Sequence, residues 1–129
     1  MEREITLAGN KQVHSTYKGF TVKTDQPPKD GGDGIAPEPY DLFLASIGTC
    51  AGVYVVYFCE KRNIPTEGIA LTVEAEKNDK THLFEKIRIR LGLPPHFPSK
   101  YRQAVVKAAE MCTVKRSLAD PPQIEVTAA

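Results

Sequence analysis

Two cysteines are the side chains of this 129-residue chain that are best suited to covalent chemistry. Cys50 lies at the centre of an uncharged run from Leu42 to Cys59, and Cys112 ends a second segment with helical periodicity. A thiolate is a nucleophile, and two neighbouring thiols can form a disulfide. The alternative is that both thiols are inert, because free cysteines are among the most buried residue types.

The third cysteine, Cys59, belongs to the same predicted helix as Cys50. At about 100° and 1.5 Å per residue, it lies on the opposite side of a straight helix and roughly 13 Å along it. A disulfide requires Cα atoms within about 7 Å of each other. We therefore predict that Cys59 does not pair with Cys50 and is a buried, small apolar residue.

Cys112 is predicted to face the core. Tyr101, Val105, Ala108 and Cys112 follow one another at helical spacing and form a single apolar stripe. The long apolar helix is the obvious element for this stripe to pack against. If the contact falls near the middle of that helix, Cys50 and Cys112 are neighbours.

No metal site or cofactor is predicted. The chain has no Cys-x-x-Cys pair, and the histidines are far from one another and from the cysteines in sequence. Metal sites built from these residue types usually bring several ligands together at short spacings. The histidines in question are His14, His82 and His96.

Two helices and several strands are expected to position the cysteines. The long helix runs from about Pro39 to Arg62, after a loop of residues 25–34 that is too rich in Pro and Gly for regular structure. The second helix runs from Ser99, a candidate N-cap, to about Cys112. Alternating apolar residues predict strands that contain Ile5–Leu7, Phe20–Val22, Ile69–Ala75, Ile87–Leu91 and Ile124–Thr127. This order predicts an α+β fold in a single domain, residues 1–129.

Composition is that of an ordinary soluble globular protein, with 41% hydrophobic and 26% charged residues. The net charge of +1 and the scattered basic residues do not favour a nucleic-acid partner. No export signal is visible, so we expect a cytoplasmic protein with reduced cysteines, and their odd number argues against a structural disulfide framework. The run from Leu42 to Cys59 is long enough to cross a membrane, but Ser46, Gly48, Thr49 and Gly52 favour a buried core helix instead.

Two motifs resemble those of the OsmC/Ohr superfamily, named after osmotically inducible protein C and organic hydroperoxide resistance protein. PYDLFLASIGTC, from Pro39 to Cys50, is similar to the family helix P-x-E-L-x-L-A-(A/S)-x-G-x-C. CTVKRSL, from Cys112 to Leu118, looks like the second cysteine motif, C-x-V-x-(K/R)-(S/T)-L. Asp25-Gln26-Pro27 and Gly31-Gly32 match the loop before the long helix.

The resemblance implies an OsmC-like fold, in which antiparallel sheets wrap around a long central helix, and an intertwined homodimer with active sites at its interface. A helix that is apolar all round needs cover on every side, which a second subunit supplies. The resemblance also implies a peroxidase. Cys50 would attack an organic hydroperoxide and become a sulfenic acid, Cys112 would resolve it as a disulfide, and an external dithiol would reduce that disulfide. Candidate residues for an apolar substrate pocket are Tyr40, Phe43 and Tyr54.

The group that would activate Cys50 departs from the family pattern. The peroxidases of the family use an Arg near the N-terminus and a Glu in the first helix motif, and this chain has Asn10 or Lys11 and Tyr40 at those places. Candidates for the supporting role are Lys11, Asp41 and Arg116. The alternative function is therefore a non-catalytic dimer of the same fold that binds an apolar small molecule or senses oxidation.

Overall fold

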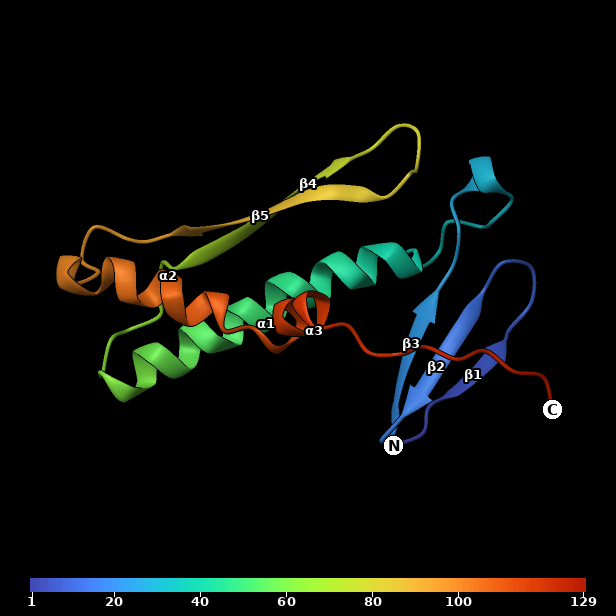
Figure 1. Cartoon of the computed structure of the whole chain (residues 1–129), viewed down its shortest axis with the longest axis horizontal. Coiled ribbons are helices and arrows are strands. Elements are labelled where there is room, and N and C mark those ends of the chain that lie inside the picture. Colours follow the sequence, from blue (N-terminus) through green and yellow to red (C-terminus); the bar gives the residue numbers. More distant parts are fainter. The chain divides into compact units, whose positions relative to one another are not determined.

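The computed structural model describes residues 1–129, which form two compact units, Met1–Leu44 and Ala45–Ala129. The first unit holds a three-stranded antiparallel sheet and the second a two-stranded one. The helix α1, Pro39–Lys61, begins in the first unit and has most of its length in the second (Figure 1). The predicted α+β class with a long helix and antiparallel sheets is thus confirmed, whereas the single domain stays a prediction.

The first unit is built on two tight reversals of the chain. Its strands are paired in the order β1-β2-β3, and the turn between β2 and β3 is the pair Lys18-Gly19, with φ of 51° and 80°. Positive φ at both residues is the geometry of a type I′ turn, which matches the twist of the flanking strands. The strands are β1 (Glu4–Leu7), β2 (Val13–Tyr17) and β3 (Phe20–Thr24). The strand β2 was not predicted, because its sequence VHSTY is mostly polar.

The loop after β3 is organised around the carboxylate of Asp25, which is fully buried. Asp25 Oδ1 accepts the Gln26 N–H at 2.7 Å, and Oδ2 accepts the Ile35 N–H at 3.2 Å. Burial by itself raises the pKa of Asp25, but the backbone N–H groups of Gln26, Ile35, Asp33 and Gly34 outweigh it and hold the pKa below 3.8. The loop includes a short 3₁₀ helix, η1 (Pro28–Asp30).

We expect this loop to lose stability in acid. The pKa of Asp25 is lower in the folded chain than in the unfolded one, so its contribution is present above about pH 4 and disappears as the pH falls through the folded pKa. The protection of the Ile35 amide, measured as its exchange rate relative to the intrinsic rate at the same pH, should therefore fall below about pH 4 in the wild type. In Asp25→Asn, protection should already be lower at neutral pH and should change less on acidification. The same pH dependence in both proteins would contradict this role of Asp25.

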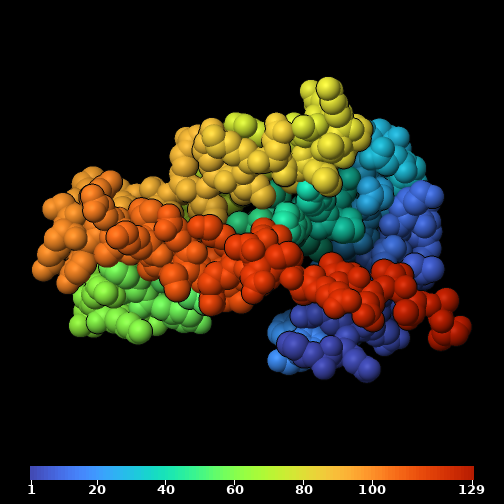
Figure 2. Space-filling view, viewed as in Figure 1, coloured from blue at the N-terminus to red at the C-terminus, as the bar shows by residue number.

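The second unit packs a β-hairpin and two further helices against α1 (Figure 1). The hairpin is β4 (Ala70–Lys77) and β5 (Phe84–Gly92), and the helices are α2 (Arg102–Glu110) and α3 (Thr113–Ala119). The predicted strands around Ile69–Ala75 and Ile87–Leu91 are confirmed. The core contains Ala51, Val55, Phe58, Cys59, Ile64, Phe97, Val105, Ala109 and Cys112. In the space-filling view, part of α1 is visible between the yellow hairpin and the orange-to-red α2 and α3 (Figure 2).

The end of α1 agrees with the sequence prediction. Asn63 adopts a left-handed conformation with φ of 52°, and the Ile64 N–H donates to the Cys59 carbonyl at 3.0 Å. This is a common way to satisfy the last carbonyls of a helix. The Arg62 guanidinium lies 3.7 Å from the centre of the Phe58 ring. By length and composition α1 could also cross a membrane, although a core helix of a soluble protein passes the same test.

Gly48 lets α1 approach the hairpin closely. A Cβ at this position would lie 2.6 Å from Cγ2 of Val73 on β4, whereas a Cβ at Gly52 would meet nothing within 4 Å. Real Cβ atoms essentially never come within 3.0 Å of another heavy atom, so Val73 or the helix would have to move. The close packing of α1 on β4 therefore requires a glycine at position 48, whereas no contact requires one at position 52.

We expect opposite effects when the two glycines are replaced. Gly48→Ala should destabilise the protein, because overpacking costs about 1–3 kcal/mol and a helical Ala gains at most about 1 kcal/mol over Gly. Gly52→Ala should stabilise it by about 0.5–1 kcal/mol. Urea unfolding of both variants measures the difference. Equal midpoints for the two variants would contradict the close contact between Gly48 and Val73.

The predicted second helix is divided in the structure. A 3₁₀ turn, η2 (Ser99–Tyr101), leads into α2, and the chain then turns at Met111 and Cys112 before α3. Ser99 is not the N-cap, because Pro98 precedes η2 and Tyr101 precedes α2. The predicted end near Cys112 agrees with the structure, but α3 lies beyond it and was not predicted.

The predicted last strand, Ile124–Thr127, is wrong for this structure. Residues 121–129 have no regular structure, and Ile124 and Val126 are 81% and 93% exposed. An extended segment becomes a strand only by hydrogen bonding to a neighbouring strand, and this one is paired in neither sheet.

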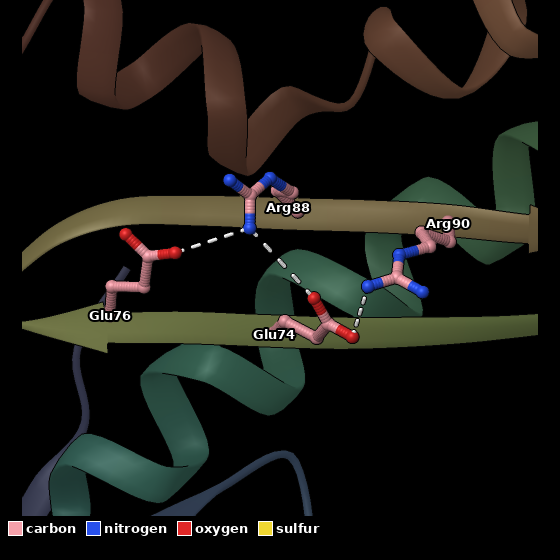
Figure 3. Close-up of polar contacts among 4 residues, drawn as sticks. All are labelled: Glu74, Glu76, Arg88 and Arg90. Atoms are coloured by element: carbon pink, nitrogen blue, oxygen red, sulfur yellow. Dashed lines mark hydrogen bonds and ion pairs between the residues drawn. The ribbon is translucent and has the colours of Figure 1, made fainter.

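Polar residues occupy the face of the hairpin that points away from the core. Arg88 pairs with Glu76 at 3.2 Å and with Glu74 at 4.0 Å, and Arg90 pairs with Glu74 (Figure 3). All four side chains are at least 40% exposed, so each pair contributes little to stability. The alternation of these residues with Leu71, Ile89 and Leu91, which pack on the core, shows which face of the hairpin is solvated.

Candidate functional site

The structure brings Cys50 and Cys112 together. Cys50 is half-buried in the middle of α1, and Cys112 is fully buried at the turn between α2 and α3. Both are free thiols, Cys50 packs against the core cluster that contains Cys112, and each thiol shifts the pKa of the other. The condition set by the sequence, a contact of Cys112 near the middle of the long helix, is met in the structure, whereas the catalytic roles of the two cysteines stay predictions.

Cys112 is held in place from two sides. Its Sγ accepts the Lys115 N–H at 3.4 Å and thereby serves as the N-cap of α3. The same Sγ lies 3.8 Å from the Ile47 carbonyl of α1, to which the thiol can donate. Thiols are weak donors and acceptors, so these contacts orient Cys112 more than they stabilise the fold.

The surroundings of the two thiols shift their pKa values in opposite directions. Burial of Cys50 raises its pKa, but hydrogen bonds from the Val114 N–H, the Cys112 thiol and the Thr113 N–H, with the charge of Arg116, lower the pKa below the ordinary value. Burial raises the pKa of Cys112; the Lys115 N–H lowers it in part, and the Cys50 sulfur raises it further. Cys50 is therefore the better nucleophile of the pair, and Cys112 the better proton donor.

Three polar side chains of α1 and α3 near Cys50 are hydrogen-bonded to one another. The hydroxyls of Tyr54 on α1 and Thr113 on α3 are 3.0 Å apart. Arg116 Nη2 lies 3.3 Å from Thr113 Oγ1 and 3.5 Å from Tyr54 Oη, and its Nε donates to the Met111 carbonyl at 3.1 Å. Three charged residues, Lys11, Asp41 and Arg116, were predicted to support Cys50. Of these, Arg116 is the one whose charge lowers the pKa of Cys50 in the structure.

The other predicted supporting residues lie in the first unit. Lys11 is in the turn between β1 and β2, where its side chain lies beside Gly31. Asp41 Oδ2 accepts the Glu38 N–H at 3.2 Å, which satisfies a free donor at the start of α1. The rings of Tyr40 and Phe43, two of the predicted pocket residues, are 5.6 Å apart. The roles of these four residues in a site with Cys50 stay predictions.

An apolar pocket of about 310 Å³ in the second unit is next to Cys112 through residues that contact its sulfur, although neither Cys112 nor Cys50 lines it. Two of its lining residues, Ile47 and Lys115, are also the backbone partners of the Cys112 sulfur. The third predicted pocket residue, Tyr54, lines a different pocket of about 330 Å³ with Tyr57 and Met111. Sequence reasoning missed the residues of the first pocket, which are Ile47, Ile87, Ile89, Leu91, Val106, Ala109, Glu110, Lys115 and Leu118.

Cys59 has no part in this arrangement. Its side chain is fully buried in the core, and burial raises its pKa despite the nearby charge of Arg62. The prediction that Cys59 is a small buried residue is confirmed. No cluster of three or more His, Cys, Asp or Glu side chains suitable for a metal ion occurs among residues 1–129.

Comparison with known proteins finds one family and several solved structures. The family described as OsmC-like protein matches residues 31–127, which is more than half of the chain. A Psychrobacter arcticus structure, described as an osmotic stress induced and detoxification response protein, is 19% identical with a TM-score of 0.78, over 89% of this chain and 85% of that one.

Two further structures carry names that refer to organic hydroperoxides. The organic hydroperoxide resistance protein OsmC from Legionella pneumophila is 20% identical, with a TM-score of 0.62 over 91% of this chain and 87% of its own. OhrB of Bacillus subtilis is 21% identical, with a TM-score of 0.57 over 94% and 93%. At these identities the likeness shows the fold alone. A search of curated protein sequences finds no match.

Proposed function

Because this chain belongs to the OsmC-like protein family, we propose that it is a thiol-dependent peroxidase that reduces organic hydroperoxides. Relatives of the same fold are named for organic hydroperoxide resistance. The observation that carries the proposal is the contact between Cys50 and Cys112, in which one thiol has a lowered pKa and the other a raised one. This is the division of roles that a nucleophile and a resolving thiol require.

In the first step the Cys50 thiolate attacks the terminal oxygen of the hydroperoxide. An S–O bond forms and the O–O bond breaks, so that the sulfur is oxidised to a sulfenic acid and the alkoxide leaves. The alkoxide takes a proton and becomes the alcohol. The N–H groups of Thr113 and Val114 favour the thiolate that starts this step.

In the second step Cys112 attacks the Cys50 sulfenic acid. The S–S bond forms, the S–O bond breaks, and the hydroxyl leaves as water with the proton of the Cys112 thiol. An external dithiol then reduces the disulfide by exchange and is itself oxidised to a disulfide. The two electrons that the hydroperoxide takes up are thus supplied by the dithiol.

The pocket beside Cys112 supports an apolar substrate. Its walls are mainly aliphatic, and only Glu110 and Lys115 bring charge to it. A pocket of about 310 Å³ is at the lower end of the range for small-molecule sites. We infer that it takes the organic part of the hydroperoxide, which would give bulky alkyl hydroperoxides an advantage over hydrogen peroxide.

A coupled assay tests the proposal. Purified protein with a dithiol such as dithiothreitol should consume cumene hydroperoxide faster than the dithiol alone does, and faster than it consumes hydrogen peroxide. Equal consumption of cumene hydroperoxide with and without the protein would refute the peroxidase.

The proposed active form is a cytoplasmic homodimer. Exposed apolar side chains on the first unit, at Leu7 and Phe20, and on α1, at Val56 and Tyr57, give a second copy surfaces to cover. Light scattering that returns the mass of one chain, 14.2 kDa, would contradict the dimer. Recovery of the untagged protein in the membrane fraction would contradict the location.

A second candidate function is the binding of an apolar small molecule without chemistry, with thiols that at most sense oxidation. The pocket beside Cys112 favours it, because the pocket exists whether or not Cys50 reacts. The rate of Cys50 alkylation against pH separates the two functions. A thiol that reacts only near or above about pH 8.5 favours binding, whereas reaction near neutral pH favours the enzyme.

A further inference from the structure

We propose that Tyr54 and Thr113 hold the Arg116 guanidinium beside Cys50, and that this held charge makes Cys50 the reactive sulfur of the chain. The inference deepens the proposed function, because it names the positioning residues of the same site. Only the catalytic importance of these residues depends on the proposed function. The reactivity of Cys50 can be measured without any peroxide.

Helix geometry places these residues together. Cys50 and Tyr54 are one turn apart on α1 and share a face of that helix. Thr113 and Arg116 are likewise one turn apart on α3, directly after Cys112. The hydrogen bond between Tyr54 and Thr113 joins residues that are 59 positions apart in the sequence. It therefore ties the helix that carries Cys50 to the helix that carries the charge.

The contacts of Arg116 leave its charge available to the sulfur. Its partners are the Met111 carbonyl and the hydroxyls of Thr113 and Tyr54, all of which are neutral. None of the ion pairs of residues 1–129 includes Arg116, since all of them join residues of the hairpin. A guanidinium without a carboxylate partner favours a nearby anion more than a paired one does.

Few other titratable groups face Cys50. On α1 the nearest is Tyr54, and the turn and helix packed against it contribute Cys112 and Arg116. The hairpin approaches α1 with the apolar side chain of Val73 next to Gly48. Four of its charged residues, Glu74, Glu76, Arg88 and Arg90, lie on the opposite face (Figure 3). Arg116 is thus the cation to remove in a test.

The test is the pH dependence of Cys50 alkylation by iodoacetamide, followed for each cysteine by peptide mass spectrometry. Arg116→Gln should slow alkylation of Cys50 near pH 7 by about threefold to tenfold and move its pH profile upward. Arg116→Lys should recover part of the rate, because it keeps the charge but not the planar contacts. Tyr54→Phe should act in the same direction as Arg116→Gln and more weakly. The matched control is Lys107→Gln, which removes one charge from the exposed side of α2 and should leave the profile unchanged.

Salt provides a second test that needs no variant. Arg116 is exposed, so its action on the sulfur is screened by ions. Cys50 alkylation in the wild type should slow as salt is raised toward about 1 M, where the screening length is about 3 Å. In Arg116→Gln the rate should depend much less on salt.

An unchanged pH profile of Cys50 alkylation in Arg116→Gln overturns the inference. If Arg116→Gln does not fold, an unchanged profile in both Tyr54→Phe and Arg116→Lys overturns it. A salt-independent wild-type profile also overturns it. A wild type that shows the predicted alkylation pattern but consumes no hydroperoxide refutes the proposed peroxidase and supports the role of Arg116. A wild type that consumes hydroperoxide, but whose Cys50 alkylation does not change in Arg116→Gln, supports the proposed peroxidase and refutes the role of Arg116.

Discussion

Cys50→Ser is expected to abolish the turnover of organic hydroperoxides. A serine hydroxyl stays protonated where the Cys50 thiol, with a lowered pKa, is partly ionised, and it is a far weaker nucleophile toward an O–O bond. The loss should be on the order of a thousandfold or more in kcat/KM, as for other enzymes that lose their nucleophile. The measurement is the steady-state consumption of cumene hydroperoxide with excess dithiol.

The control for this variant is Cys59→Ala. Cys59 lies on the same helix but is fully buried and away from Cys112, so its removal should change stability modestly and leave turnover intact. Circular dichroism and a thermal melt show whether Cys50→Ser is folded. A folded Cys50→Ser that retains wild-type turnover, or a loss of turnover in a folded Cys59→Ala, would show that the chemistry is not at Cys50.

Without added dithiol, Cys112→Ser is expected to stop at the Cys50 sulfenic acid, whereas the wild type goes on to the Cys50–Cys112 disulfide. The Cys50 sulfenic acid would still form, but no neighbouring thiol would convert it into a disulfide. The variant should consume about one equivalent of hydroperoxide per chain in a burst, and a dimedone adduct on Cys50 should be found by mass spectrometry. In the wild type the same treatment should give a disulfide-linked peptide that contains Cys50 and Cys112.

The serine at position 112 also keeps a hydrogen-bond acceptor at the N-cap of α3, where Cys112 now accepts the Lys115 N–H. Ser is a preferred N-cap residue, so the variant should fold and α3 should persist. This separates the loss of the resolving thiol from a loss of structure. Turnover at the wild-type rate in the presence of dithiol, with no sulfenic acid trapped in its absence, would remove Cys112 from the mechanism.

Much of the second unit could be predicted from the sequence, because its main signals are local. The uncharged run from Leu42 to Cys59 can only be a buried helix or a membrane span, and the helical repeat places Cys59 away from Cys50. The hairpin follows from strict alternation in Ile69–Ala75 and Ile87–Leu91. The motif from Cys112 to Leu118 contains Arg116, which the sequence analysis named as a candidate to support Cys50.

The remaining features depend on contacts between distant residues. The end of the second helix near Cys112 was predicted, but the helix α3 that follows it was missed, because the sequence was expected to leave regular structure there. The role of Thr113 could not be seen, since its partner Tyr54 lies on another helix. The strand expected at Ile124–Thr127 has the right alternation but no partner strand in this chain.

The close contact of Gly48 with Val73 makes two distant positions interdependent in their tolerance of substitution. A larger residue at 48 is incompatible with Val at 73, but a smaller residue at 73 would leave room for it. Effects of substitutions at these positions should therefore be non-additive, with Val73→Ala rescuing part of the cost of Gly48→Ala. Because Gly48 lies two positions before Cys50, the hairpin constrains which sequences can present the thiol at all.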